Sequence, residues 1–85
     1  MIIKFRYGFV FNDVLYGFND KKLFRFPQNI GLRSYPLKEL PKIKVGNKEG
    51  YLLHPSKRKS MAQIRSMLIF IDKEVQVIED KDVLF

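Results

Sequence analysis

The stretch that decides the fold is residues 2–26, with the sequence IIKFRYGFVFNDVLYGFNDKKLFRF. Phe, Tyr, Val, Ile and Leu dominate it, and such residues fit the pleated, half-buried surface of a strand. Two turn-forming pairs, Asn12-Asp13 and Asn19-Asp20, interrupt the run. We therefore predict an antiparallel meander with strands near residues 2–11, 14–18 and 22–26.

The pattern becomes less regular after Pro27. Pro36 favours one helical turn over residues 35–40, because proline suits the first turn of a helix. Pro41 would then end that turn. Further short strands are predicted by the apolar and β-branched residues of 42–45, 51–53 and 74–79.

A helix is predicted near residues 60–70. Ser60 and Gln63 match the capping box S-x-x-Q, in which each side chain accepts a hydrogen bond from the other residue's backbone N–H. Apolar residues then follow at helical spacing. The sequence therefore predicts a single α+β domain over residues 1–85, with a mostly antiparallel sheet of five to six short strands packed against this helix.

Charge is divided unevenly along the chain, which has a formal net charge of +7. Residues 1–65 contain 14 of the 16 Lys and Arg but four of the nine acids, and residues 66–85 contain the other five acids. A basic body suggests a polyanionic partner. The acidic segment 66–85 has two interpretations: an ordinary solvated strand and terminus, or a segment that folds over the basic face.

Several classes of function have little support in the sequence. The chain has no cysteine and one histidine, His54, so we expect no disulfide, no metal site and no cofactor. Gly46 and Gly50 lack the spacing of a phosphate-binding loop. The longest apolar run, residues 67–71, is far shorter than the roughly 18 residues of a membrane span, and the start does not match a signal peptide. We therefore expect a cytoplasmic location, in a bacterium or in a host cell.

Two features point to binding. The first is Lys57-Arg58-Lys59, predicted as a basic loop that holds phosphates together with Arg65. The second is a set of cations interleaved with aromatic residues, which is typical of modules that pair phosphates and stack bases. We expect additional contacts from Lys21, Lys22, Arg25 and Arg33, with Tyr7 and Tyr35 as the stacking residues. Each feature also has a plainer interpretation, a solvated turn for the first and an aromatic core for the second.

These observations favour a small, basic, non-enzymatic protein that binds DNA or RNA. The alternative is a protein-interaction module, such as a small phage-type inhibitor or accessory subunit that docks on an acidic protein. A third possibility is a metal-independent nuclease. The aromatic-rich opening, the small size and the lack of a catalytic motif resemble small phage or mobile-element proteins in general, without a shared motif.

Overall fold

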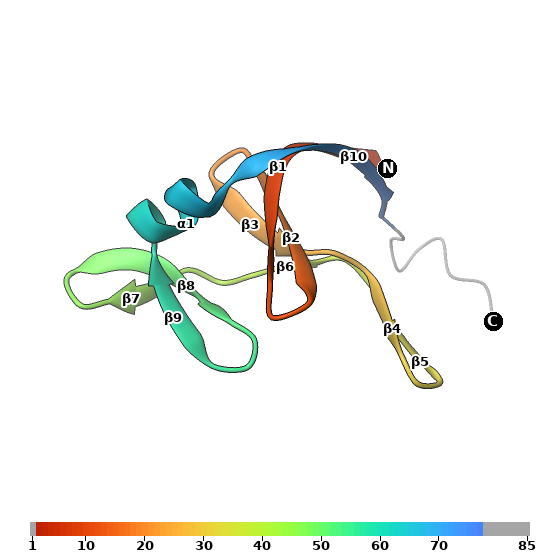
Figure 1. Cartoon of the computed structure of the whole chain (residues 1–85), viewed down its shortest axis with the longest axis horizontal. Helices are drawn as coiled ribbons and strands as arrows, with labels where there is room; N and C mark the ends of the chain where they lie inside the picture. The colour runs from red at the N-terminus through yellow and green to blue at the C-terminus, as the bar shows by residue number, and fades with distance from the viewer. Residues whose placement is uncertain (1, 78–85) are drawn as a thin grey trace.

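The computed structural model describes residues 2–77 and contains ten strands in three small antiparallel sheets, with one short helix (Figure 1). Strands hold 64% of these residues and helix holds 9%. The prediction of an α+β domain with one sheet of five to six strands is therefore wrong, and the protein is mostly β. The error arose because several short extended segments of the polar middle region carry no apolar alternation to reveal them.

The largest sheet has five strands in the order β10-β1-β2-β3-β6. Its strands are β1 (Ile2–Phe11), β2 (Val14–Asn19), β3 (Lys22–Arg25), β6 (Lys38–Glu39) and β10 (Ile69–Gln76). The predicted meander of three N-terminal strands is confirmed to within one residue at each end. The last strand begins earlier than predicted, and residues 78 and 79 of that prediction lie outside the described residues.

A two-stranded hairpin follows the meander. It consists of β4 (Gln28–Ile30) and β5 (Arg33–Tyr35), and it extends away from the other sheets at the lower right of Figure 1. The helical turn predicted over residues 35–40 is wrong. Tyr35 precedes a proline, which disfavours helical backbone at that residue. Lys38 and Glu39 instead form β6 by pairing with β3.

The third sheet has the order β7-β8-β9 and consists of β7 (Ile43–Val45), β8 (Lys48–Leu53) and β9 (Lys57–Ser60). Helix α1 (Met61–Met67) follows β9 directly. The predicted capping box is confirmed, because Ser60 Oγ accepts from the Gln63 N–H at 3.3 Å and Gln63 Oε1 accepts from the Ser60 N–H at 2.9 Å. The helix is shorter than predicted because Leu68 is extended and residues 69–71 join β10.

The main hydrophobic cluster joins the five-stranded sheet to the three-stranded sheet and α1. Its buried members come from β1, β2, β3, β8 and α1, and they are Phe9, Val14, Tyr16, Leu23, Tyr51, Leu53 and Ile64. Burial of apolar area at this junction is the main force that holds the two sheets together. The three-stranded sheet contributes two strand residues to it, Tyr51 and Leu53, both almost fully buried.

A second cluster lies on the opposite side of the five-stranded sheet, since Leu23 and Phe24 belong to different clusters and successive residues of a strand point to opposite faces. Its buried residues are Phe5, Phe26 and Val75. The ring of Phe5 lies 5.3 Å from that of Phe24 and 4.9 Å from that of Phe26, between centroids. Aromatic packing therefore dominates this smaller core.

Gly17 makes room for that aromatic packing. A Cβ atom at this position would contact the ring of Phe26 and would lie 2.6 Å from Phe5 Cδ1. Because both rings are buried and also contact each other, neither can withdraw without opening the second cluster. A side chain at Gly17 is therefore excluded by the packing of its neighbours.

We predict that Gly17→Ala lowers the free energy of unfolding by about 1–3 kcal/mol, the usual cost of overpacking a core. Urea unfolding followed by far-UV circular dichroism measures this change. In a Phe5→Leu background the same substitution should cost less, because the smaller side chain can yield space. An equal cost in both backgrounds would contradict the assignment of the clash to Phe5.

Candidate nucleic-acid interface

The predicted basic loop is a strand. Lys57, Arg58 and Lys59 form most of β9, which pairs with β8 and is the edge strand of the three-stranded sheet. The prediction of a loop was wrong because alternating cations do not show the apolar periodicity of a strand. Lysine and arginine are common on edge strands, where charge prevents pairing with a second chain.

The three cations of β9 do not all point the same way. Lys59 is opposite Tyr51, and Lys57 is opposite Leu53, so both lie on the side of the buried β8 residues. The Lys59 ammonium sits 5.5 Å from the centre of the Phe11 ring. Arg58 lies on the other side, opposite Leu52, which is 47% exposed. Cations therefore line both sides of this edge.

Helix α1 adds Arg65 to the same part of the molecule. The helix packs on β8 and β9 through Ile64, which is fully buried, while Arg65 is exposed. Arg65 also lies in the last turn, where a cation stabilises the helix dipole. At the start of α1 the capping box uses the backbone N–H groups of Ser60 and Gln63.

The three-stranded sheet and α1 form the most basic part of the described chain. Residues 42–65 contain seven Lys and Arg and a single acid, Glu49. Lys42 forms an exposed ion pair with Glu49 at 3.8 Å. Within residues 2–77, no other ion pair involves this segment. We call this unit the basic module; its cations are Lys42, Lys44, Lys48, Lys57, Arg58, Lys59 and Arg65.

The remaining predicted phosphate contacts are on neither β9 nor α1. Lys21 and Lys22 lie at the β2–β3 turn, which touches the basic module because the Lys21 carbonyl accepts from the Tyr51 hydroxyl. Arg33 is on the projecting β4–β5 hairpin. Arg25 lies against Tyr35, with 5.9 Å between its guanidinium carbon and the ring centre. The structure thus brings Lys57, Arg58, Lys59 and Arg65 together, but not the other four cations.

The two predicted stacking residues differ in accessibility. Tyr7 is 50% exposed and makes an edge-on contact with Phe70, which is 67% exposed, at 6.1 Å between ring centres. Tyr35 is partly buried beneath Arg25. Neither tyrosine belongs to the basic module, so the predicted combination of phosphate pairing and base stacking is not assembled at one place.

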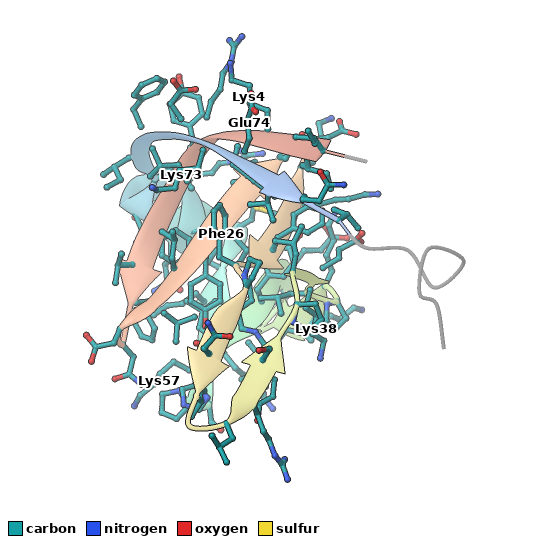
Figure 2. The ribbon with its side chains drawn as sticks, turned by 90° about the vertical axis from the view of Figure 1, so that its right-hand side faces the viewer. Lys4, Phe26, Lys38, Lys57, Lys73 and Glu74 are labelled. Atoms are coloured by element: carbon teal, nitrogen blue, oxygen red, sulfur yellow. The ribbon has the colours of Figure 1, made fainter. Side chains whose placement is uncertain are left out.

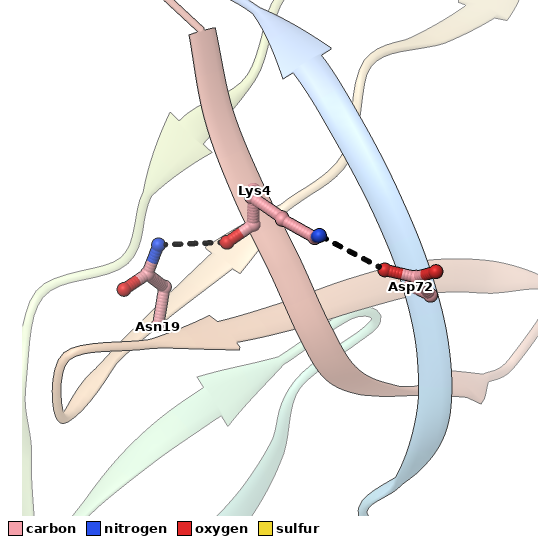
Figure 3. A network of polar contacts seen from close by, with 3 residues as sticks. All are labelled: Lys4, Asn19 and Asp72. Atoms are coloured by element: carbon pink, nitrogen blue, oxygen red, sulfur yellow. Dashed lines mark hydrogen bonds and ion pairs between the residues drawn. The ribbon is translucent and has the colours of Figure 1, made fainter.

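Lysines outside the basic module are spread around the molecule and partly neutralised. Figure 2 shows Lys4 and Lys38 at separate places on the surface, both apart from Lys57 of the basic module. Lys4 pairs with Asp72 at 3.6 Å, and its carbonyl accepts from Asn19 Nδ2 at 2.9 Å (Figure 3). Lys22 pairs with Glu39 at 3.9 Å. Of the acidic segment 66–85, residues 69–76 form β10, which pairs with β1, and residues 78–85 lie outside the described residues.

Sequence reasoning missed Lys38. This side chain lies directly opposite Arg25 in the pairing of β3 with β6. No local signal marks it, because the segment was predicted as a helical turn and a cross-strand neighbour is set by register alone. His54 was interpreted as a turn residue, and it does occupy the turn after β8.

Comparison with known proteins gave no relative: no protein-family model, no curated protein and no solved structure matches this chain. Within residues 2–77, no group of three or more His, Cys, Asp or Glu side chains is close enough to hold a metal ion. No helix in the same range has the length and apolar character needed to cross a membrane. The function must therefore be argued from the basic module itself.

Tyr51 anchors the basic module to the five-stranded sheet. Its hydroxyl donates to the Lys21 carbonyl at 3.4 Å, and its ring is 1% exposed. Burial raises the pKa of the Tyr51 phenol above its ordinary value of 10.0, and the carboxylates of Glu39 and Glu49 raise it further, while a backbone hydrogen bond with Leu23 opposes the change. The folded protein therefore holds the Tyr51 proton more tightly than the unfolded chain.

We predict that Tyr51 contributes stability that is fully present below pH about 10 and is lost as the pH rises through its raised pKa. Tyr51→Phe should be less stable than the parent at neutral pH, because it lacks the hydroxyl. The difference in unfolding free energy should shrink above pH 10, since the parent alone loses this contribution. Urea titrations across the alkaline range test this, with Tyr7→Phe as the control for an exposed ring. A constant difference would refute it.

Proposed function

We propose that this protein is a non-enzymatic nucleic-acid-binding protein and that it holds the phosphate backbone along β9 and α1. The observation that supports the proposal is the charge of the basic module, which contains seven Lys and Arg residues and a single carboxylate, Glu49. Lys57, Arg58 and Lys59 are consecutive residues of an edge strand, with Arg58 on the opposite side from the two lysines, and Arg65 is on the helix packed against that strand.

Phosphate is the anion that suits this arrangement best. Lys and Arg that neutralise several phosphates at once release the counterions bound to the nucleic acid, and this release favours binding. Contacts of this kind fix the position of a protein on the backbone but do not read the bases. A row of closely spaced cations therefore gains more from a repeating polyanion than from isolated carboxylates.

The basic module favours binding without base preference. The module has no Phe or Trp and its one tyrosine, Tyr51, is buried, so the exposed imidazole of His54 is the one ring there on which a base can stack. The exposed aromatic pair, Tyr7 and Phe70, lies on β1 and β10 of the other sheet. Recognition through β9 is accordingly expected to depend on charge and salt and to tolerate any sequence.

We predict micromolar or tighter binding to mixed-sequence DNA and RNA at low salt, measured by fluorescence anisotropy with labelled oligonucleotides. If Lys57, Arg58, Lys59 and Arg65 each neutralise one phosphate, the log–log slope of affinity against salt on duplex DNA is about −3 to −4. Replacing the three β9 cations together with Gln should reduce the magnitude of the slope to about 1. Absence of binding at low salt would refute the proposal.

A matched variant controls for total charge. Lys4, Arg6 and Lys73 are exposed cations of the five-stranded sheet, and replacing all three with Gln removes the same charge as the β9 variant. This control should retain the slope of the parent within about one unit. Equal loss in both variants would mean that binding follows net charge and not β9. Capture of a protein that persists after nuclease treatment and requires β9 would favour the acidic-protein alternative instead.

A further inference from the structure

A cavity of about 310 Å³ lies where the five-stranded sheet meets the three-stranded sheet. Its walls come from β3 and β6 on one side and from β8 and the turn after it on the other, with the segment between β6 and β7 as a further wall. Pockets that bind small molecules occupy about 300–1,000 Å³, so this cavity is at the small end of that range. A compact ligand is therefore indicated, and a large cofactor is not.

Two cations form the polar end of this cavity. Arg25 of β3 and Lys38 of β6 are direct cross-strand partners, and both line the cavity. Like charges placed opposite each other destabilise a sheet. No acidic side chain lines the cavity, and among residues 2–77 neither cation forms an ion pair. An anion between the two cations would remove this repulsion.

The guanidinium of Arg25 has an N–H donor from which such an anion can accept a hydrogen bond. Its Nε atom is buried and has no hydrogen-bond partner among the described residues. The guanidinium carbon lies 5.9 Å from the centre of the Tyr35 ring, near the outer limit of a cation–π contact. A guanidinium whose face rests on a ring keeps its N–H edges available, and their fork geometry matches phosphate and carboxylate.

Most of the remaining lining is apolar, with Tyr16 and His54 as the other polar residues. Leu40, Ile43, Leu52 and Pro55 are among its lining residues. The turn that carries Pro55 is tied to the large sheet, because the His54 backbone N–H donates to the Tyr16 hydroxyl at 3.0 Å. A ligand that fits both ends has an anionic group at one end and a compact apolar body at the other.

We propose that this cavity binds a phosphate monoester with a compact organic body, for which adenosine monophosphate serves as the probe. The phosphate would lie between Arg25 and Lys38, and the faces of the base would rest against Leu40, Ile43 and Leu52. This site uses no residue of β9, so it stands independently of the proposed backbone binding.

Titration of the ¹⁵N-labelled protein with adenosine monophosphate, followed by ¹H–¹⁵N correlation spectra, tests the proposal. Saturable shifts should appear at the amides of Leu40, Ile43 and Leu52 in the millimolar range or below. Adenosine and inorganic phosphate, each tested alone, should bind more weakly, because each satisfies one end of the cavity. Equal affinity for phosphate and the nucleotide, or no saturable shift, would overturn the proposal.

Three variants locate the site. Lys38→Gln should weaken nucleotide binding about tenfold or more, the range expected for one charge-assisted hydrogen bond. Arg25→Lys keeps the charge but loses the fork, and it should weaken binding as well. Lys73→Gln, at an exposed position of β10 outside both the cavity and the basic module, is the matched control and should leave affinity unchanged. The spectra also show whether each variant is folded. Unchanged affinity in Lys38→Gln and Arg25→Lys would overturn the proposal, whatever the outcome for β9.

Discussion

The structure depends on the bend that β1 and β10 make together. Their pairing shifts register between Phe5 and Tyr7, where two residues of β10, Ile71 and Asp72, oppose the single residue Arg6. Asp72 has a φ of 47°, a left-handed conformation that aspartate tolerates better than most residues. A bulge of this kind bends the strand and increases its twist. Figure 1 shows both strands turning together over the top of the sheet.

Because of this bend, one strand serves two hydrophobic clusters. Phe9 belongs to the cluster shared with the three-stranded sheet, and Phe5 belongs to the cluster on the opposite side. Polar contacts support the corner, since Lys4 reaches Asp72 while its carbonyl accepts from Asn19 (Figure 3). With most of the aromatic core supplied by the large sheet, the basic module needs few buried residues of its own. Its edge strand is thereby free to carry charge.

The parts of the fold that were predictable from sequence are those in which local pattern and tertiary position agree. The N-terminal strands were recognisable because strand-forming apolar residues fill them and turn-forming pairs separate them, although Ile2, Tyr7 and Val10 are exposed. The capping box was recognisable because its hydrogen bonds are local. Strand β9 was not, since its residues pair by backbone while their side chains are cations. Strand β6 is two residues long and exists because β3 offers it an edge. Neither the backbone pairing of β9 nor the edge that β3 offers to β6 can be read from the local sequence.

The two candidate sites also differ in whether the local sequence reveals them. The cluster Lys57-Arg58-Lys59 is contiguous in sequence, so composition alone identified it, although its form as a strand was missed. Arg25 and Lys38 are thirteen residues apart and become neighbours only through the register of β3 with β6. A one-residue slip of that register would turn Lys38 to the other face of the sheet. The repulsion between these two cations is therefore a property of the folded state, absent from the unfolded chain, and an anion in the cavity would stabilise the fold by relieving it.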